Sequence, residues 1–134
     1  MLEKRIKNNA DALSRTLNAV KLLNEDELSH LYELHDLYVK ALDLTGELMS
    51  DALYLKDTAY TERKHEQARL MIESEGTIAE RQAHAEIAVK EYRDNEDKGN
   101  YIYTRYKARN KSLDHKLFDI KAKRAAMEKE LQNT

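Results

Sequence analysis

The chain has 134 residues, the length of one domain, of which 36% are charged and 41% hydrophobic, and its net charge is -2. It contains no proline, three glycines and no cysteine, which excludes disulfides and cysteine chemistry and favours long, uninterrupted helices. No apolar run reaches the ~18 residues that a membrane-spanning helix requires, and the N-terminus lacks the apolar segment of a secretory signal. We therefore expect an all-α, cytoplasmic protein without a membrane-spanning segment.

The first two predicted helices span residues 2–23 and 25–74. Apolar residues in the first recur with the 4-3-4-3 spacing of a coiled-coil seam. Asn24, with Glu27 three residues later, has the pattern of a helix start. Gly46 lies inside the second helix, where it indicates either a kink or a close contact with another helix.

The clearest turn signal is the sequence SEGTIAER, residues 74–81. Gly76 can adopt the left-handed conformation that closes a helix. Thr77 can then cap the next helix, with Glu80 at the third position of a capping box. The sequence therefore predicts a tight turn built by Gly76, Thr77 and Glu80.

The remaining chain is predicted to form helices over 77–97 and 101–132, separated at Gly99 and Asn100. A single helix that runs through this segment is the alternative. The last helix carries a stripe of apolar residues at helical spacing: Ile102, Tyr106, Leu113, Leu117, Ile120, Met127 and Leu131. These elements predict a single helical domain, either a long antiparallel hairpin or an elongated bundle with coiled-coil-like packing. Because the apolar stripes are long, we also expect a homo-oligomer.

Charge is unevenly distributed along the chain. Residues 25–62 carry ten acidic and two basic groups, whereas residues 101–134 carry nine basic and four acidic groups. One interpretation is that acidic and basic helices pair within a bundle. The other is that the basic end binds a polyanion, either single- or double-stranded DNA or RNA.

The segment NYIYTRYKARNK, residues 100–111, is the candidate for nucleic-acid binding. Basic side chains can neutralise phosphates, and tyrosines can stack on bases. Tyr106 falls on the apolar stripe and is predicted to be buried. The candidate contact residues are those off the stripe: Tyr101, Tyr103, Arg105, Lys107 and Lys111.

Two pairs, Glu27 with His30 and Glu62 with His65, have the Glu-x-x-His spacing found in di-iron bundles. Such a site needs further inward-facing carboxylates, and the surroundings of Glu62 are polar on every face. No phosphate loop or nucleophile motif is present. We therefore predict no catalytic residue, no cofactor and no metal site, and we rank a metal-dependent bundle enzyme below the interaction functions.

Residues 52–131 resemble a group of small helical proteins encoded by tailed bacteriophages and prophages, often near replication and recombination genes. The shared pattern is a tyrosine- and lysine-rich helix, an E-G-[ST]-x-x-E-R turn, an alanine-rich helix, a tyrosine segment and a basic final helix. The matching positions are Glu75, Gly76, Thr77, Glu80, Arg81, Ala83, Tyr92, Leu113, Leu117 and Ile120.

This resemblance implies a non-enzymatic phage accessory protein in a bacterial host cell. Such a protein would act by protein–protein interaction on a phage DNA-processing factor or on a host factor. The alternative is a weakly sequence-specific nucleic-acid-binding protein that uses its basic C-terminal helix.

Overall fold

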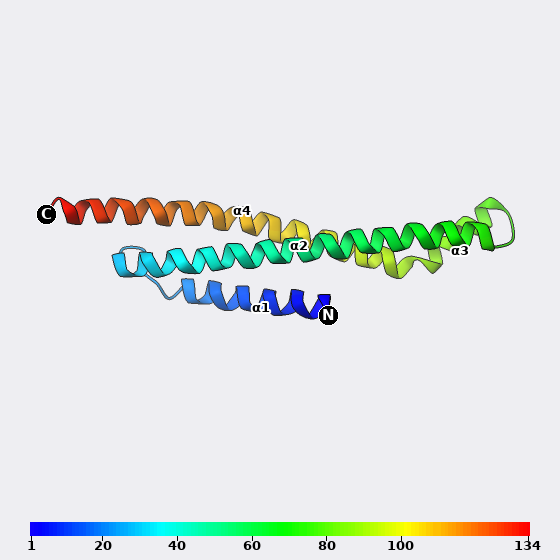
Figure 1. Cartoon of the computed structure of the whole chain (residues 1–134), viewed down its shortest axis with the longest axis horizontal. Coiled ribbons are helices and arrows are strands. Elements are labelled where there is room, and N and C mark those ends of the chain that lie inside the picture. Colours follow the sequence, from blue (N-terminus) through cyan, green and yellow to red (C-terminus); the bar gives the residue numbers. More distant parts are fainter. The chain divides into compact units, whose positions relative to one another are not determined.

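The computed structural model describes all 134 residues and contains four helices and no strand. The helices are α1 (Leu2–Val20), α2 (Leu28–Glu73), α3 (Ile78–Ala88) and α4 (Lys90–Gln132), as shown in Figure 1. Together they hold 89% of the chain. The prediction of an all-α protein in which long helices pack against each other is confirmed.

The chain divides into two compact units. Unit 1 comprises residues 1–49 and 105–134, and unit 2 comprises residues 50–104. Helices α2 and α4 each contribute residues to both units, whereas α1 belongs to unit 1 and α3 to unit 2.

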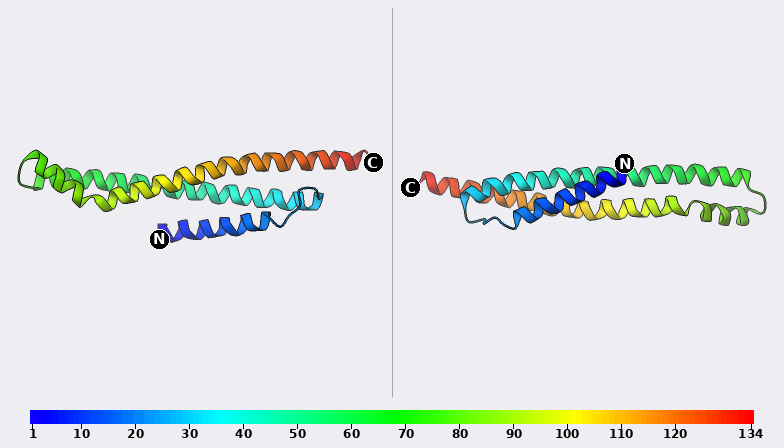
Figure 2. Two further views of the ribbon diagram at one scale, coloured as in Figure 1. Left: turned by 180° about the vertical axis from the view of Figure 1, so that it is seen from behind. Right: turned by 90° about the horizontal axis from the view of Figure 1, so that it is seen from below.

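In unit 1, α1 and α4 (105–132) both lie alongside α2 (28–49), as two views show (Figures 1 and 2). The short connection after α1 makes it antiparallel to α2. Buried residues on α2 are three or four positions apart, as coiled-coil packing requires. They and their partners on α1 and α4 form the core: Leu13, Leu31, Leu34, Tyr38, Ala41, Leu48, Tyr106, Leu113, Leu117 and Ile120.

This core also contains a polar contact between two helices. The side-chain amide of Asn110 donates a hydrogen bond of 2.8 Å to Oγ1 of Thr45, which is fully buried, and lies 3.4 Å from the carbonyl oxygen of Leu42. The Thr45 hydroxyl donates to the same carbonyl at 2.9 Å. Each buried polar group in this contact therefore has a partner, so its burial carries little penalty.

Unit 2 has a core of small side chains: Ala52, Ala59, Ala85 and Val89. They allow α2 and α4 to approach closely. A Cβ atom placed on Gly99 would lie 2.8 Å from the carbonyl oxygen of Ala52 and 2.9 Å from the backbone nitrogen of Lys56. Gly99 is thus a packing residue inside α4, which runs through it without a break.

An ion pair between α2 and α4 lies beside this close approach. The guanidinium of Arg63 donates to both carboxylate oxygens of Glu96, at 2.5 and 3.1 Å. The two side chains are 10% and 16% exposed. Arg63 also donates to Gln67, so its charge is held by several acceptors at the edge of the core.

The turn after α2 uses the three residues singled out in the sequence. Gly76 has a φ of 110°, which residues with side chains rarely adopt. Thr77 is the N-cap of α3, and its hydroxyl accepts a hydrogen bond of 3.1 Å from the backbone N–H of Glu80. This bond satisfies one of the free N–H groups at the start of α3.

The helix boundaries differ from the sequence-based ones at one point above all. Of the two possibilities for residues 94–100, a break or a helix that runs through, the structure shows the continuous helix, because α4 extends from Lys90 to Gln132. The break between α3 and α4 lies at Val89, which is fully buried with φ -100° and ψ 10°. The second helix continues through Gly46, where a Cβ atom would meet nothing within 4 Å, so this glycine marks neither an interruption nor a close contact.

Candidate interaction surfaces

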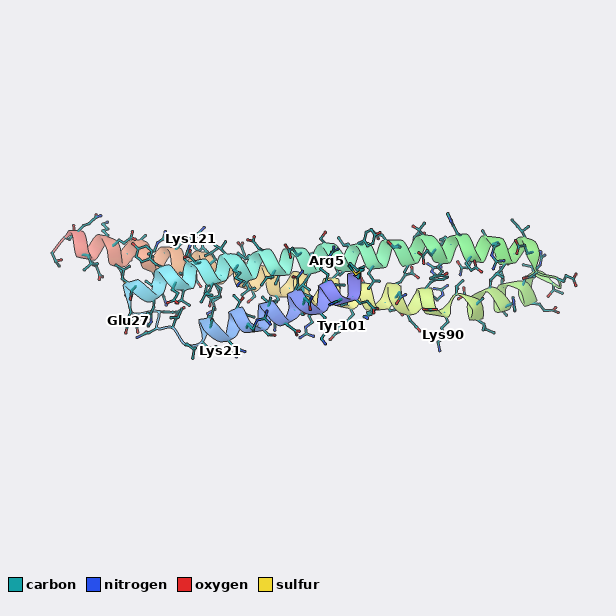
Figure 3. The ribbon with its side chains drawn as sticks, turned by 60° about the horizontal axis from the view of Figure 1, so that its bottom comes forward. Arg5, Lys21, Glu27, Lys90, Tyr101 and Lys121 are labelled. Carbon is teal, nitrogen blue, oxygen red and sulfur yellow. The ribbon has the colours of Figure 1, made fainter.

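The tyrosine- and lysine-rich segment lies entirely within α4. Tyr101 is 65% exposed and projects outward (Figure 3), whereas Tyr103 is half-buried and makes an interaction of its own. Two residues apart on a helix means about 160° around its axis. The two tyrosines therefore point in nearly opposite directions and do not form one stacking surface.

The basic candidates of this segment are all exposed, but they also divide between faces. Lys107 and Lys111, four residues apart, share a face of α4, and Arg105 lies about 160° from Lys107. The guanidinium of Arg105 sits 5.8 Å from the ring centroid of Tyr106. Tyr106 itself is only 9% exposed, as its place on the apolar stripe predicted. Only the two lysines are brought together.

The first Glu-x-x-His pair is engaged in a local contact at the start of α2. Glu27 Oε2 lies 3.3 Å from His30 Nε2, and His30 Nδ1 accepts a hydrogen bond of 2.9 Å from the backbone N–H of Asn24. Both imidazole nitrogens are thus occupied within the turn. No group of three or more His, Asp or Glu side chains in the chain is placed to hold a metal ion.

Unit 2 exposes large apolar side chains while it buries small ones. Ile72 at the end of α2 is 83% exposed and Ile87 on α3 is 78% exposed. A shallow groove between these helices is lined by Gln67, Met71, Gln82, Ala85 and Glu86. Other exposed apolar residues of unit 2 are Leu53, Tyr54, Tyr60, Ile78 and Tyr101. Unit 2 therefore offers apolar surface that its own fold does not cover.

The carboxylate of Glu86, which lines this groove, is held in an ion pair with Arg93. The guanidinium of Arg93 donates two hydrogen bonds of 2.8 Å to the carboxylate of Glu86, which also accepts one from Gln67. The hydrogen bonds from Arg93 hold the pKa of Glu86 below its usual value. Glu86 therefore stays ionised around neutral pH.

Unit 1 also has an apolar surface that is not covered. Phe118 on α4 is 73% exposed, and Tyr32 and Val39 on α2 are 46% and 38% exposed. The Tyr32 hydroxyl donates to Glu128, and the guanidinium of Arg124 lies 5.2 Å from the Tyr32 ring centroid. The hydrogen bond to Glu128 raises the pKa of Tyr32. Phe118 was not among the residues selected from the sequence.

No family model matches the chain, and no similar protein is found among the curated proteins or the solved structures. The resemblance to bacteriophage proteins therefore stays a prediction. None of the four helices combines the length and apolar character needed to cross a bilayer.

Proposed function

We propose that this chain is a non-enzymatic accessory protein that acts by binding another protein through the outer surface of unit 2. In line with the resemblance of residues 52–131, it is a phage protein that works in the bacterial cytoplasm. Its target is a replication or recombination factor or a host factor. We further propose that the chain self-associates.

The observation that carries this proposal is that unit 2 buries small apolar side chains and exposes large ones. Its buried hydrophobic residues are alanines and one valine, whereas three isoleucines and three tyrosines are exposed: Ile72, Ile78, Ile87, Tyr54, Tyr60 and Tyr101. Exposed isoleucine contributes nothing to folding, and burying such a side chain on a partner gains about 1.5–3 kcal/mol. Ile72 and Ile87 therefore favour a function in recognition.

We expect the variant Ile72→Ser/Ile87→Ser to lose partner binding while it keeps its fold. Tagged protein would be purified from phage-infected cells after nuclease treatment, and the yield of a stoichiometric partner would be compared with the wild type. Because both side chains are exposed, helicity should not change. We expect at least a roughly tenfold loss of captured partner, which corresponds to about 1.4 kcal/mol.

The matched control is Leu22→Ser/Leu131→Ser, which removes two exposed leucines of unit 1, 83% and 63% exposed. This variant should capture as much partner as the wild type. Equal capture by the unit 2 variant, or no stoichiometric partner at all, would contradict the proposal.

A second candidate function is nucleic-acid binding by the basic part of α4. Residues 105–134 hold nine basic and four acidic side chains, and Arg105, Lys107 and Lys111 are exposed. Phosphate contacts of this kind bind with little sequence preference and weaken as salt rises. Since Tyr101 and Tyr103 do not share a face, such binding would rest mainly on charge.

If this candidate is correct, Arg105→Ala/Lys107→Ala should weaken single-stranded DNA binding and reduce the salt slope by about one unit for each phosphate interaction removed. Helix stability should change little, since both side chains are exposed. Fluorescence anisotropy at a series of salt concentrations would measure the slope. A wild-type protein that does not bind DNA at about 50 mM salt would refute this function.

A further inference from the structure

One side of the α2–α4 pair in unit 1 is covered by α1, and the other is not. On the covered side, Asn9 of α1 donates to Glu47 of α2 at 3.1 Å, and Lys123 of α4 bonds Glu25 in the α1–α2 connection at 3.0 Å. On the other side the contact is direct, from Tyr32 of α2 to Glu128 of α4. Figures 1 and 2 show no further helix there.

Apolar residues follow the uncovered side of α2 with coiled-coil spacing. Tyr32, Val39 and Gly46 recur every seven residues, each one position after a buried residue of the core. They therefore share a flank of α2, and the Tyr32 contact places that flank next to α4. A Cβ atom at Gly46 would meet nothing within 4 Å, so this flank is open at that position.

Phe118 holds the equivalent place on α4. It follows buried Leu117 by one position and lies three residues before Lys121. Glu128 marks the uncovered flank of α4 because it bonds Tyr32. Lys121 lies seven residues before Glu128 and therefore shares this flank. Its side chain is exposed at the outside of the helix (Figure 3). Phe118 is thus on the same side of unit 1 as Val39.

The two helices carry opposite charges on their exposed positions. Apart from Glu47, which bonds α1 on the covered side, the exposed acidic residues on α2 of unit 1 still outnumber the single exposed lysine: Glu33, Asp36 and Asp43, against Lys40. Exposed lysines predominate on the outer part of α4: Lys107, Lys111, Lys121 and Lys129, with Asp114 among them. A partner for this surface should present a basic helix to α2 and an acidic helix to α4.

We propose that the uncovered side of the α2–α4 pair is the interface with a second copy of this chain, related by a twofold axis parallel to the helices. Such an axis places α2 of one copy opposite α4 of the other, so acidic positions meet basic ones. A twofold axis across the helices would instead place α2 against α2, with like charges facing. This inference rests on the self-association proposed above and names its surface.

The same symmetry fixes which residues meet. Rotation about an axis parallel to the helices leaves the height of each residue unchanged, so the alignment of α2 and α4 within a copy is repeated between copies. Within a copy, Thr45 lies level with Asn110. Val39 then comes level with Phe118 of the second copy, and Asp43 comes level with Lys111 of the second copy, each contact occurring twice.

A nucleic acid fits this surface less well, because the acidic positions of α2 lie beside the lysines of α4 and would repel phosphates. A purely basic partner would likewise be repelled by the lysines of α4. The second copy satisfies both halves of the charge pattern.

The test is the mass of purified full-length protein and three variants by sedimentation equilibrium, with helicity as the check on folding. The wild type should have twice the chain mass of 15.7 kDa. Phe118→Ser, which alters a 73% exposed side chain, should raise the dissociation constant at least about tenfold, as removal of a central aromatic side chain does. Asp43→Lys should also weaken the dimer, and Asp43→Lys/Lys111→Asp should restore it.

A wild-type monomer at high micromolar concentration would overturn this inference, and so would a dimer unaffected by Phe118→Ser. Failure of the charge exchange to restore the dimer would exclude the twofold arrangement. Binding of single-stranded DNA that is abolished in Phe118→Ser would assign the surface to a nucleic acid instead. A monomer that still captures its partner through Ile72 and Ile87 would leave the partner-binding proposal standing.

Discussion

Gly99→Ala is expected to destabilise the protein by about 1–3 kcal/mol, the usual cost of overpacking a close contact. The added methyl group would lie 2.8 Å from the Ala52 carbonyl oxygen and 2.9 Å from the Lys56 nitrogen, which are backbone atoms. Backbone cannot rotate away as a side chain can, so α2 and α4 must move apart in unit 2. This separation also loosens the small alanine core around the contact.

Gly46→Ala is the matched control and should have the opposite sign. It is also an interior glycine of a long helix, but its Cβ would meet nothing within 4 Å. Alanine should stabilise α2 by up to about 1 kcal/mol through its greater helix propensity. Urea unfolding followed by helicity would measure both variants, and a stabilising Gly99→Ala would show that the close approach is absent.

Glu96→Ala should cost about 2–3 kcal/mol of unfolding free energy. It leaves the guanidinium of Arg63, whose side chain is 10% exposed, without its carboxylate partner. Breaking a fully buried ion pair costs about 3–5 kcal/mol, and the value here should be lower because both groups retain some contact with water. Gln67 still accepts one hydrogen bond from Arg63, which also reduces the cost.

The double variant Arg63→Met/Glu96→Met distinguishes the stability that the ion pair contributes from the cost of leaving the Arg63 charge unpaired. Replacing both partners by apolar side chains removes the unpaired charge, so most of the stability should return. Chemical unfolding of Arg63→Met, Glu96→Met and the double variant would give the coupling energy. A coupling energy near zero would show that the pair contributes little.

The helical class and the main stripe of α4 could be predicted because their signals are local and repeated. Leu113, Leu117 and Ile120 alternate at three- and four-residue spacing, and all three are buried. The buried part of this stripe ends before the apolar spacing in the sequence does, since Leu131 is 63% exposed. Periodicity identifies the face of a helix, but it does not say how far a neighbouring helix extends.

The break between α3 and α4 could not be located from sequence. Ala88, Val89 and Lys90 carry no turn signal, whereas Gly99 next to Asn100 carries a strong one. In the structure the helix breaks at Val89 and continues through Gly99, because Val89 is held in the core and Gly99 is needed for the close approach of α2. Both are consequences of tertiary packing.

The candidate surfaces were only partly visible in the sequence. Exposed lysines of α4 follow from its charge pattern, but Phe118 stands next to Leu117 and cannot be assigned to the outside until the buried face is known. Burial of Arg63 was equally hidden, because its local sequence is polar on every side. Its partner Glu96 lies 33 residues away.

The Asn110–Thr45 contact has a consequence for how α2 and α4 find their correct alignment during folding. Two helices whose apolar residues repeat every seven positions can slide by one repeat and still bury similar surface. Such a slip would move Asn110 from Thr45 to the level of Tyr38, where the side-chain amide would lose its 2.8 Å hydrogen bond. A fully buried unsatisfied polar group costs about 1–3 kcal/mol, and the half-buried Asn110 amide costs less. This one amide therefore still discriminates against misaligned pairings that hydrophobic burial alone would tolerate.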